Sequence, residues 1–219
     1  MKYLKNIQSL VGSTLSMISW TGIKITPVWG SYSAFFTASQ IAYPLAGLYA
    51  PRKLLFALWA IKSTLRAYFF SGSLLLATTY YLPTTAAALF LSAPNTRKTR
   101  LLTALAFVSA ALLFFGAVGY SAALWYATLW VIPTLLASVG VQNLFARSIV
   151  ATFLAHALGS AFWAYTLPLA PVSWVALIPV ALTERLFYAS GITLSALCIN
   201  RVLFSNSHQT VRSAAPCKQ

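Results

Sequence analysis

Apolar segments of about 20 residues follow one another along almost the whole chain, and this limits the folds open to it. The 219 residues are 59% hydrophobic and 7% charged, a balance typical of integral membrane proteins and not of soluble domains. In lipid, backbone N–H and C=O groups must find partners within the protein, and helices satisfy these groups internally. The sequence therefore predicts an all-α, polytopic integral membrane helix bundle.

Eight apolar segments can be drawn as membrane-spanning helices. They cover residues 7–25, 33–50, 54–70, 74–93, 101–118, 121–138, 144–165 and 172–200. Segment 7–25 and one of the two segments that flank Gly72 are the weakest, so six spans is the alternative count. Residues 205–219 are polar and charged, which is typical of a disordered tail. We therefore predict a transmembrane domain over residues 1–204 and a disordered cytoplasmic tail over residues 205–219.

Basic residues mark the ends of alternate apolar segments. Fifteen lysines and arginines against a single acid give a formal net charge of +14. The basic groups that recur after every second segment are Lys2 and Lys5, Arg52 and Lys53, Arg97, Lys98 and Arg100, Arg147, and Arg201. The links near Gly72, Gly119 and Pro168 carry no charge, and Lys24 is the exception. The positive-inside rule then predicts cytoplasmic termini and an even number of spans. Because they are scattered at helix ends, the basic residues predict contact with membrane lipid and no nucleic-acid partner.

Glu184 is the only acidic residue, and this excludes several kinds of chemistry. The chain has no carboxylate pair for acid–base catalysis, no acidic Mg²⁺ site and no Walker motif, so it cannot hydrolyse ATP by a known arrangement. Cys198 and Cys217 form no C-x-x-C motif, and His156 and His208 are far apart in the sequence. The sequence thus predicts a protein that is not an enzyme and that has no catalytic residues, metal or cofactor.

The run of residues 148–201 carries the functional prediction. It predicts two spans joined by a turn that contains proline, with His156, Glu184 and Arg185 near their middles. A charged group at bilayer depth costs about 2.5–3.5 kcal/mol, so it normally faces a partner, a cavity or a substrate. The lone carboxylate of Glu184 is therefore a candidate for a functional site.

Two helical faces in this run carry polar and aromatic side chains at positions i, i+4 and i+7. On the first span these are His156, Ser160 and Trp163, and on the last they are Glu184, Tyr188 and Gly191. Trp174 lies at the outer start of the last span. If the two faces meet, they enclose an apolar cavity with a few convergent polar groups, which suits a small ligand. The alternative is a buried pair of Glu184 with Arg185 or His156 that only fixes helix packing.

Lys62 and Arg66 are four residues apart within an apolar segment, so they share one helical face. One interpretation is that both side chains extend to lipid headgroups. The other is that one of them meets Glu184 or an anionic ligand.

Two stretches resemble a known family. They are TPVWGSYSAFFTASQIAYPLAGLYAPR, residues 26–52, and FLAHALGSAFWAYTLPLAPVSWVALIPVALTERL, residues 153–186. Together with the size and hydropathy of the chain, they are similar to the first loop and second helix, and to the last two helices, of the S components of energy-coupling factor transporters. These S components are the substrate-binding membrane subunits of bacterial vitamin importers.

The resemblance implies a six-helix membrane protein that binds its ligand from outside the cell. Ligand contacts in that family come from the outer loops and the later helices. In this chain they fall on Trp29, Tyr32, His156, Trp163, Trp174 and Glu184. Trp29 and Tyr32 have an alternative role as interfacial anchors. The family also implies a coupling membrane subunit and two cytoplasmic ATPases as partners. The Ala-x-x-x-Ala motif usual on its first helix is absent, and Gly12 and Ser16 are the candidate substitutes.

We therefore expect a multi-pass protein of the bacterial inner membrane that binds a small-molecule substrate, a vitamin-like nutrient, for uptake. Lys62, Arg66, Arg147 and Arg185 are the reason to consider an anionic ligand. Two alternatives stay open. One is a non-transporting membrane subunit that scaffolds or assembles a complex, and the other is a membrane-embedded enzyme that depends on His156.

Overall fold

The computed structural model describes residues 2–18, 24–25, 36–71, 73–167 and 169–212. Its helices are α1 (Lys2–Ile18), α2 (Ser39–Ala46), α3 (Arg52–Arg66), α4 (Leu74–Ser92), α5 (Arg97–Val118), α6 (Tyr120–Ala127), α7 (Val131–Val139), α8 (Leu144–Thr166), α9 (Pro171–Ala176) and α10 (Ile178–Arg212). A π-helical turn, Ala67–Ser71, extends α3, and a 3₁₀ turn, Thr128–Trp130, joins α6 to α7. Strands β1 (Lys24–Ile25) and β2 (Phe36–Thr37) form a two-residue antiparallel pair that aligns Lys24 with Thr37.

Five helical segments in the described part of the chain are long and apolar enough to cross a membrane. They are Leu74–Ser92, Arg97–Val118, Ala122–Val139, Leu144–Thr166 and Ile178–Leu203. Apart from the short strand pair, the described residues form helices and their turns. The chain is therefore a helical, multi-pass membrane protein, as the apolar segments predict.

The N-terminal third differs from the predicted segments. Helix α1 ends at Ile18 and Lys24–Ile25 is a strand, so residues 7–25 do not form one helix. In the same way, Phe36–Thr37 is a strand and α2 covers only eight residues of segment 33–50. The physical reason lies in composition, because Thr, Ile and Gly have lower helix propensities than Ala or Leu, and apolar content alone does not distinguish a strand from a helix.

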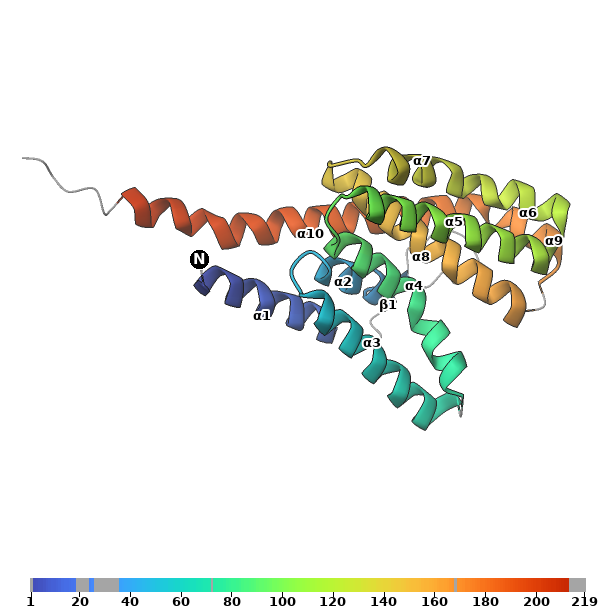
Figure 1. Cartoon of the computed structure of the whole chain (residues 1–219), viewed down its shortest axis with the longest axis horizontal. Coiled ribbons are helices and arrows are strands. Elements are labelled where there is room, and N and C mark those ends of the chain that lie inside the picture. The colour runs from blue at the N-terminus through green and yellow to red at the C-terminus, as the bar shows by residue number, and fades with distance from the viewer. Residues whose placement is uncertain (1, 19–23, 26–35, 72, 168, 213–219) are drawn as a thin grey trace, which may run out of the picture.

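Helix α8 is the centre of the bundle. It packs against α4, α5 and α10, and Figure 1 shows α5, α8 and α10 running side by side. Its buried positions are rich in small residues, with Ala151 and Ala155 on one face and Ala157 on another. Small side chains let helix backbones approach closely in membranes, where van der Waals packing replaces the hydrophobic effect as the source of association. The position of α8 places the face that carries His156 inside the protein.

Prolines interrupt three of the predicted spans. Pro83 lies inside α4, and Figure 1 shows this helix bending near its middle so that its first half diverges from the bundle together with α3. A proline within a helix lacks the N–H donor and clashes with the carbonyl four residues earlier, which bends the helix. Pro133 follows the 3₁₀ turn between α6 and α7, and Pro179 follows the break between α9 and α10. The bend in α4 separates α3 from the rest of the bundle on one side.

Turns at the two ends of the bundle have the expected chemistry. Asn143 caps α8, because its Oδ1 accepts hydrogen bonds from the backbone N–H groups of Phe145 and Ala146. Gly119 and Gly140 end α5 and α7 with φ angles of 88° and 79°. Glycine adopts such positive φ angles without the steric cost that other residues incur.

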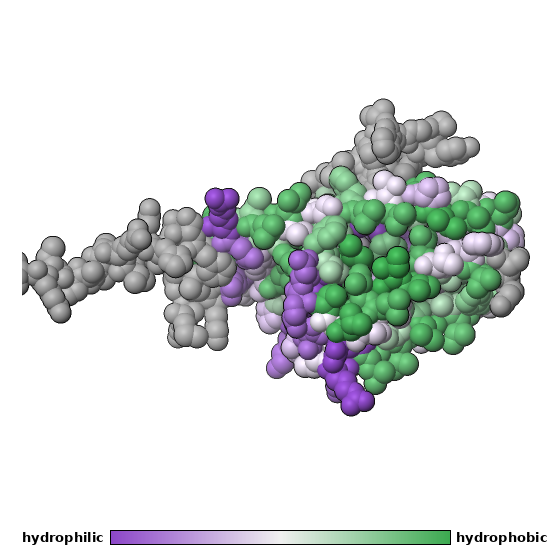
Figure 2. All heavy atoms as spheres, turned by 90° about the horizontal axis from the view of Figure 1, so that it is seen from above, coloured by the Kyte–Doolittle hydropathy of each residue, from purple (hydrophilic) through white to green (hydrophobic). Residues whose placement is uncertain are grey.

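Arginines gather at one end of the bundle, around the C-terminus of α4. Arg52 donates a hydrogen bond to the Ser92 carbonyl, and Arg100 donates one to the Val139 carbonyl. Arg147 Nη2 lies 2.9 Å from the Ala93 carbonyl oxygen and also reaches two preceding carbonyls of α4. Figure 2 shows hydrophilic side chains gathered toward one end of the bundle beside a broad apolar surface. We refer to the region of Arg52, Arg100 and Arg147 as the basic end.

Replacing Arg147 by alanine should lower the free energy of unfolding by about 2 kcal/mol, because hydrogen bonds from a charged donor to the carbonyls at the end of α4 are lost. The thermal unfolding midpoint of the purified protein in detergent measures this. Arg97→Ala is the matched control, since Arg97 is an exposed arginine at the start of α5. Equal midpoints for the two variants would show that Arg147 does not stabilise the end of α4.

Helix α10 is longer than the last predicted span. It continues to Arg212, past residue 205, where the polar tail was predicted to begin, and Figure 1 shows it projecting beyond the bundle. Residues 213–219 of that tail lie outside the described part of the chain. The domain boundary after residue 204 and the disorder of the tail stay predictions.

Candidate functional site

A cavity of about 870 Å³ lies between α3 and the first half of α4 on one side, and α6, α8, α9 and α10 on the other. Its described lining residues are Ser39, Gln40, Tyr43, Lys62, Leu65, Arg66, Phe69, Tyr80, Tyr81, Pro83, Thr84, Tyr126, Ala155, His156, Gly159, Ser160, Trp163, Leu167, Leu169, Trp174, Leu177 and Arg185. The bend at Pro83 helps to form it, because the first half of α4 leans away from α8 at that point. Binding sites for small organic molecules have volumes of about 300–1,000 Å³.

One side of the cavity is basic and aromatic. Lys62 Nζ lies 4.4 Å from the centroid of the Tyr43 ring, and Arg66 Cζ lies 3.8 Å from the centroid of the Tyr80 ring. Lys62 and Arg66 share a face of α3, as their spacing predicts, and that face is turned to the cavity. A ring face is electron-rich, so it stabilises a nearby cation within a partly apolar environment. We call Lys62, Arg66, Tyr43 and Tyr80 the α3 side.

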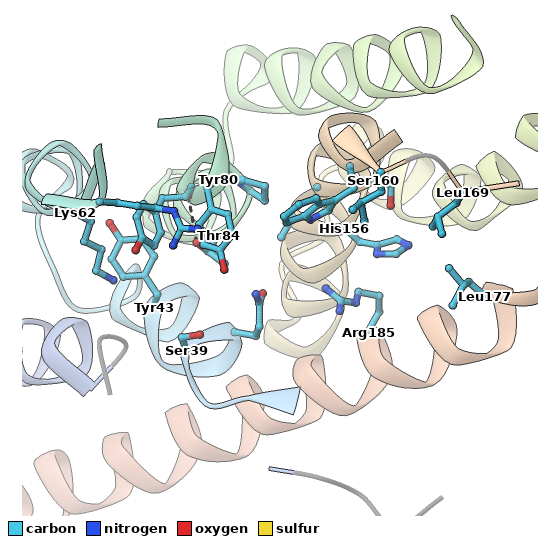
Figure 3. A pocket seen from close by; sticks show the side chains of 18 of the residues that line it. Ser39, Tyr43, Lys62, Tyr80, Thr84, His156, Ser160, Leu169, Leu177 and Arg185 are labelled. Atoms are coloured by element: carbon cyan, nitrogen blue, oxygen red, sulfur yellow. Dashed lines mark hydrogen bonds between the residues drawn. The ribbon is translucent and has the colours of Figure 1, made fainter. Parts of the chain in front are cut away.

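The opposite side of the cavity carries a hydrogen-bonded group on α6 and α8. Tyr126 Oη lies 3.0 Å from His156 Nε2 and 3.4 Å from Ser160 Oγ. Among the described residues, Ser160 hydrogen-bonds to Tyr126, and no hydrogen bond joins Ser160 to His156. Figure 3 shows His156 and Ser160 across the cavity from Lys62 and Tyr43.

Aromatic packing holds the Tyr126 ring in place. Its centroid lies 5.0 Å from that of Phe114 in a stacked arrangement and 5.4 Å from that of Trp174 in an edge-to-face arrangement. Trp174 also meets Phe114 edge to face at 5.0 Å and is buried. Such pairs contribute about 0.5–1.5 kcal/mol beyond the area that they bury. The hydroxyl of Tyr126 is therefore presented to the cavity from a rigid wall.

Arg185 joins this opposite side from α10. Its Nη2 donates to Glu184 Oε2 at 2.8 Å, and its Cζ lies 4.8 Å from the Tyr188 ring centroid. Its side chain is 9% exposed, and its Nε has no hydrogen-bond partner among the described residues. Figure 3 shows the guanidinium group facing the cavity. We call Arg185, Tyr126, His156 and Ser160 the α10 side.

The structure brings three of the six predicted ligand contacts to one cavity. His156, Trp163 and Trp174 line it, and Ser160 lies on the same face of α8 as predicted. Glu184 is not among the described lining residues, and its carboxylate accepts a hydrogen bond from Arg185, which does line the cavity. Trp29 and Tyr32 lie outside the described residues.

Several lining residues were not predicted as ligand contacts. Tyr43, Tyr80, Tyr81 and Tyr126 are spread over three helices, and their spacing within each helix carries no common pattern. A tyrosine within an apolar span is weak evidence for a ligand site, since tyrosine is also common in protein cores. In the described part of the chain, no three His, Cys, Asp or Glu side chains come together as a metal-binding group.

Comparison with models of protein families, with curated proteins and with solved structures finds no match. Inference about function therefore depends on the cavity and the chemistry of its lining.

Proposed function

We propose that this protein is the substrate-binding membrane subunit of an uptake transporter for a small nutrient in a bacterial inner membrane. The observation that carries the proposal is the cavity of about 870 Å³ with aromatic and basic lining. It provides apolar rings for a carbon skeleton and a few polar groups for orientation, the usual composition of a small-molecule site.

The position of the cavity supports binding from outside the cell. Helices α4 and α8 contribute to the cavity with the halves that lie away from the basic end, the first half of α4 and the second half of α8. By the positive-inside rule the basic end is cytoplasmic, so the cavity lies in the outer half of the bundle.

The same rule sets the proposed topology. Counting α3, with its π-helical extension, together with the five apolar helices gives six spans. An even number puts both termini on the same side of the membrane, and the basic end makes that side cytoplasmic. ATP hydrolysis is supplied by partners, because the single acid of the chain cannot form a nucleotide-binding Mg²⁺ site. The resemblance to S components points to a coupling membrane subunit and cytoplasmic ATPases as these partners.

A panel of vitamins, vitamin precursors and amino acids should contain a compound that changes the tryptophan fluorescence of the purified protein in a saturable way. Trp163 and Trp174 line the cavity and report on a bound ligand. The variant Gly159→Phe should abolish the signal, because residue 159 lines the cavity and a large side chain there fills it.

Gly159→Ala is the matched control. A Cβ atom at this position meets Pro83 Cγ at 3.7 Å, an ordinary contact, so this variant should fold and bind like the wild-type protein. The proposal fails if no compound in the panel gives a saturable signal, or if Gly159→Phe binds with unchanged affinity. A scaffold or assembly subunit predicts the first of these results.

A further inference from the structure

The two sides of the cavity differ in net charge. Lys62 and Arg66 add two positive charges on the α3 side, and no acidic residue is among the described residues that line the cavity. On the α10 side, the charge of Arg185 is balanced by Glu184 at 2.8 Å. Since Glu184 is the only acidic residue of the chain, the charged side chains at the cavity keep a net positive charge even when Glu184 is counted with them. That excess lies on the α3 side.

The α10 side is neutral overall but rich in hydrogen-bond donors. Arg185 keeps N–H groups beyond the one that binds Glu184, and its buried Nε has no acceptor among the described residues. The Tyr126 hydroxyl and the Ser160 hydroxyl lie on the same side. A buried donor without an acceptor is unfavourable, so this side suits a neutral acceptor such as a carbonyl oxygen or a ring nitrogen.

Aromatic rings and a proline line the cavity between the two sides. Tyr81, Pro83 and Trp163 line it, and the Tyr80 ring meets the Trp163 ring edge to face with centroids 5.9 Å apart. Figure 3 shows Tyr80 and Thr84 between Lys62 on one side and Arg185 on the other. Aromatic walls of this kind accommodate a planar ring.

We propose that the ligand is a planar organic anion bound in one orientation, with its carboxylate or other acidic group against Lys62 and Arg66 and a neutral acceptor toward Arg185, Tyr126 and Ser160. This inference rests on the proposed function and specifies the substrate class of the same cavity. An anion at the α3 side is attracted by two cations, whereas a cationic ligand is repelled by both. An anionic lipid headgroup has the same charged chemistry, so the test must separate it from a soluble acid.

The probes are 4-acetamidobenzoate, its neutral primary amide 4-acetamidobenzamide, the cation 4-acetamidobenzylamine, and 4-propylbenzoate, which lacks the neutral acceptor. The corresponding biphenyl compounds extend the series to two rings. Dissociation constants are measured from tryptophan fluorescence in detergent without anionic lipid. In the wild-type protein, the acid should bind about tenfold more tightly than the amide, with the amine weakest, because only the acid can form ion pairs with Lys62 and Arg66, in which both partners are charged.

Three variants assign the two ends of the ligand. The double variant Lys62→Gln, Arg66→Gln should abolish the preference for acid over amide. The double variant Arg97→Gln, Lys98→Gln, an equal loss of charge at exposed positions of α5, should leave it unchanged. The double variant Glu184→Gln, Arg185→Gln removes the ion pair without leaving a buried charge. It should keep the preference for acid over amide and should remove the advantage of 4-acetamidobenzoate over 4-propylbenzoate.

Each other outcome overturns the inference. If the amide or the amine binds as well as the acid, the cavity binds small molecules but not by this charge pattern, and the proposed function stands alone. If none of the probes binds, the orientation proposed here is wrong, and the nutrient panel with Gly159→Phe decides separately on the proposed function. If phosphatidylglycerol nanodiscs, but no acid, stabilise the protein in a manner lost with Lys62→Gln, Arg66→Gln, the α3 side binds a lipid headgroup.

Discussion

Replacing Gly47 by alanine is expected to lower the free energy of unfolding by about 3 kcal/mol, because the new methyl group has no room at the crossing of α2 and α4. A Cβ atom at Gly47 collides with the carbonyl oxygen of Ala88 and lies 2.8 Å from its carbonyl carbon. The obstacle is helix backbone, which cannot rotate away as a side chain can. The two helices must therefore separate, and they also lose the packing of Tyr43 and Leu45 in the cores around this crossing.

Two other glycines form a graded control. At Gly191 the nearest atom to an added Cβ is Ile41 Cδ1 at 2.7 Å, the far end of a flexible side chain, so Gly191→Ala should cost less than Gly47→Ala. At Gly159 the nearest atom is Pro83 Cγ at 3.7 Å, so Gly159→Ala should leave stability unchanged or slightly raised, since alanine favours a helix over glycine. Thermal midpoints of the purified variants give the order. Equal midpoints for Gly47→Ala and Gly159→Ala would show that α2 and α4 do not cross as described.

The helical membrane class could be predicted from sequence because it depends on segment length and apolar content. The five long spans follow from long apolar runs such as 101–118, in which almost every residue favours insertion into the bilayer. The first two segments, 7–25 and 33–50, were predicted less well. There the apolar residues are fewer, and tertiary contacts decide between a helix and a short strand.

The face of α8 that lines the cavity could also be predicted from sequence. His156, Ser160 and Trp163 share a face by helical period alone, and all three line the cavity. On the last span, helical period placed Glu184 with Tyr188 and Gly191 on the predicted ligand face, and the adjacent Arg185 points about 100° away from Glu184 on α10. The structure places Arg185 on the cavity and Glu184 beside it. The tyrosines of α2, α4 and α6 meet only through the tertiary fold, which no spacing within one helix records.

Breaking the ion pair of Glu184 and Arg185 is the second change that should have a large effect on stability. Glu184→Gln should lower the free energy of unfolding by about 3 kcal/mol, because it leaves the charge of a guanidinium group that is 9% exposed without its counter-charge. The double variant Glu184→Gln, Arg185→Gln removes both charges and should be within about 1 kcal/mol of the original protein, since a buried ion pair contributes little beyond its own desolvation cost. Thermal midpoints of both variants and of Arg185→Gln complete a double-mutant cycle.

The ligand affinity of Glu184→Gln separates a structural role for Glu184 from a binding role, because the two roles predict opposite changes in affinity. If Glu184 only balances Arg185, its loss adds a positive charge to the cavity wall, and 4-acetamidobenzoate should bind more tightly although the protein is less stable. If the carboxylate itself contacts the ligand, affinity should fall in step with stability. Measurement well below the unfolding midpoint keeps the variant folded, and 4-acetamidobenzamide shows how much of the change is due to charge. A weaker acid affinity with an equal loss for the amide would place Glu184 in direct contact with the ligand and would move the neutral end of the site from Arg185 to its partner.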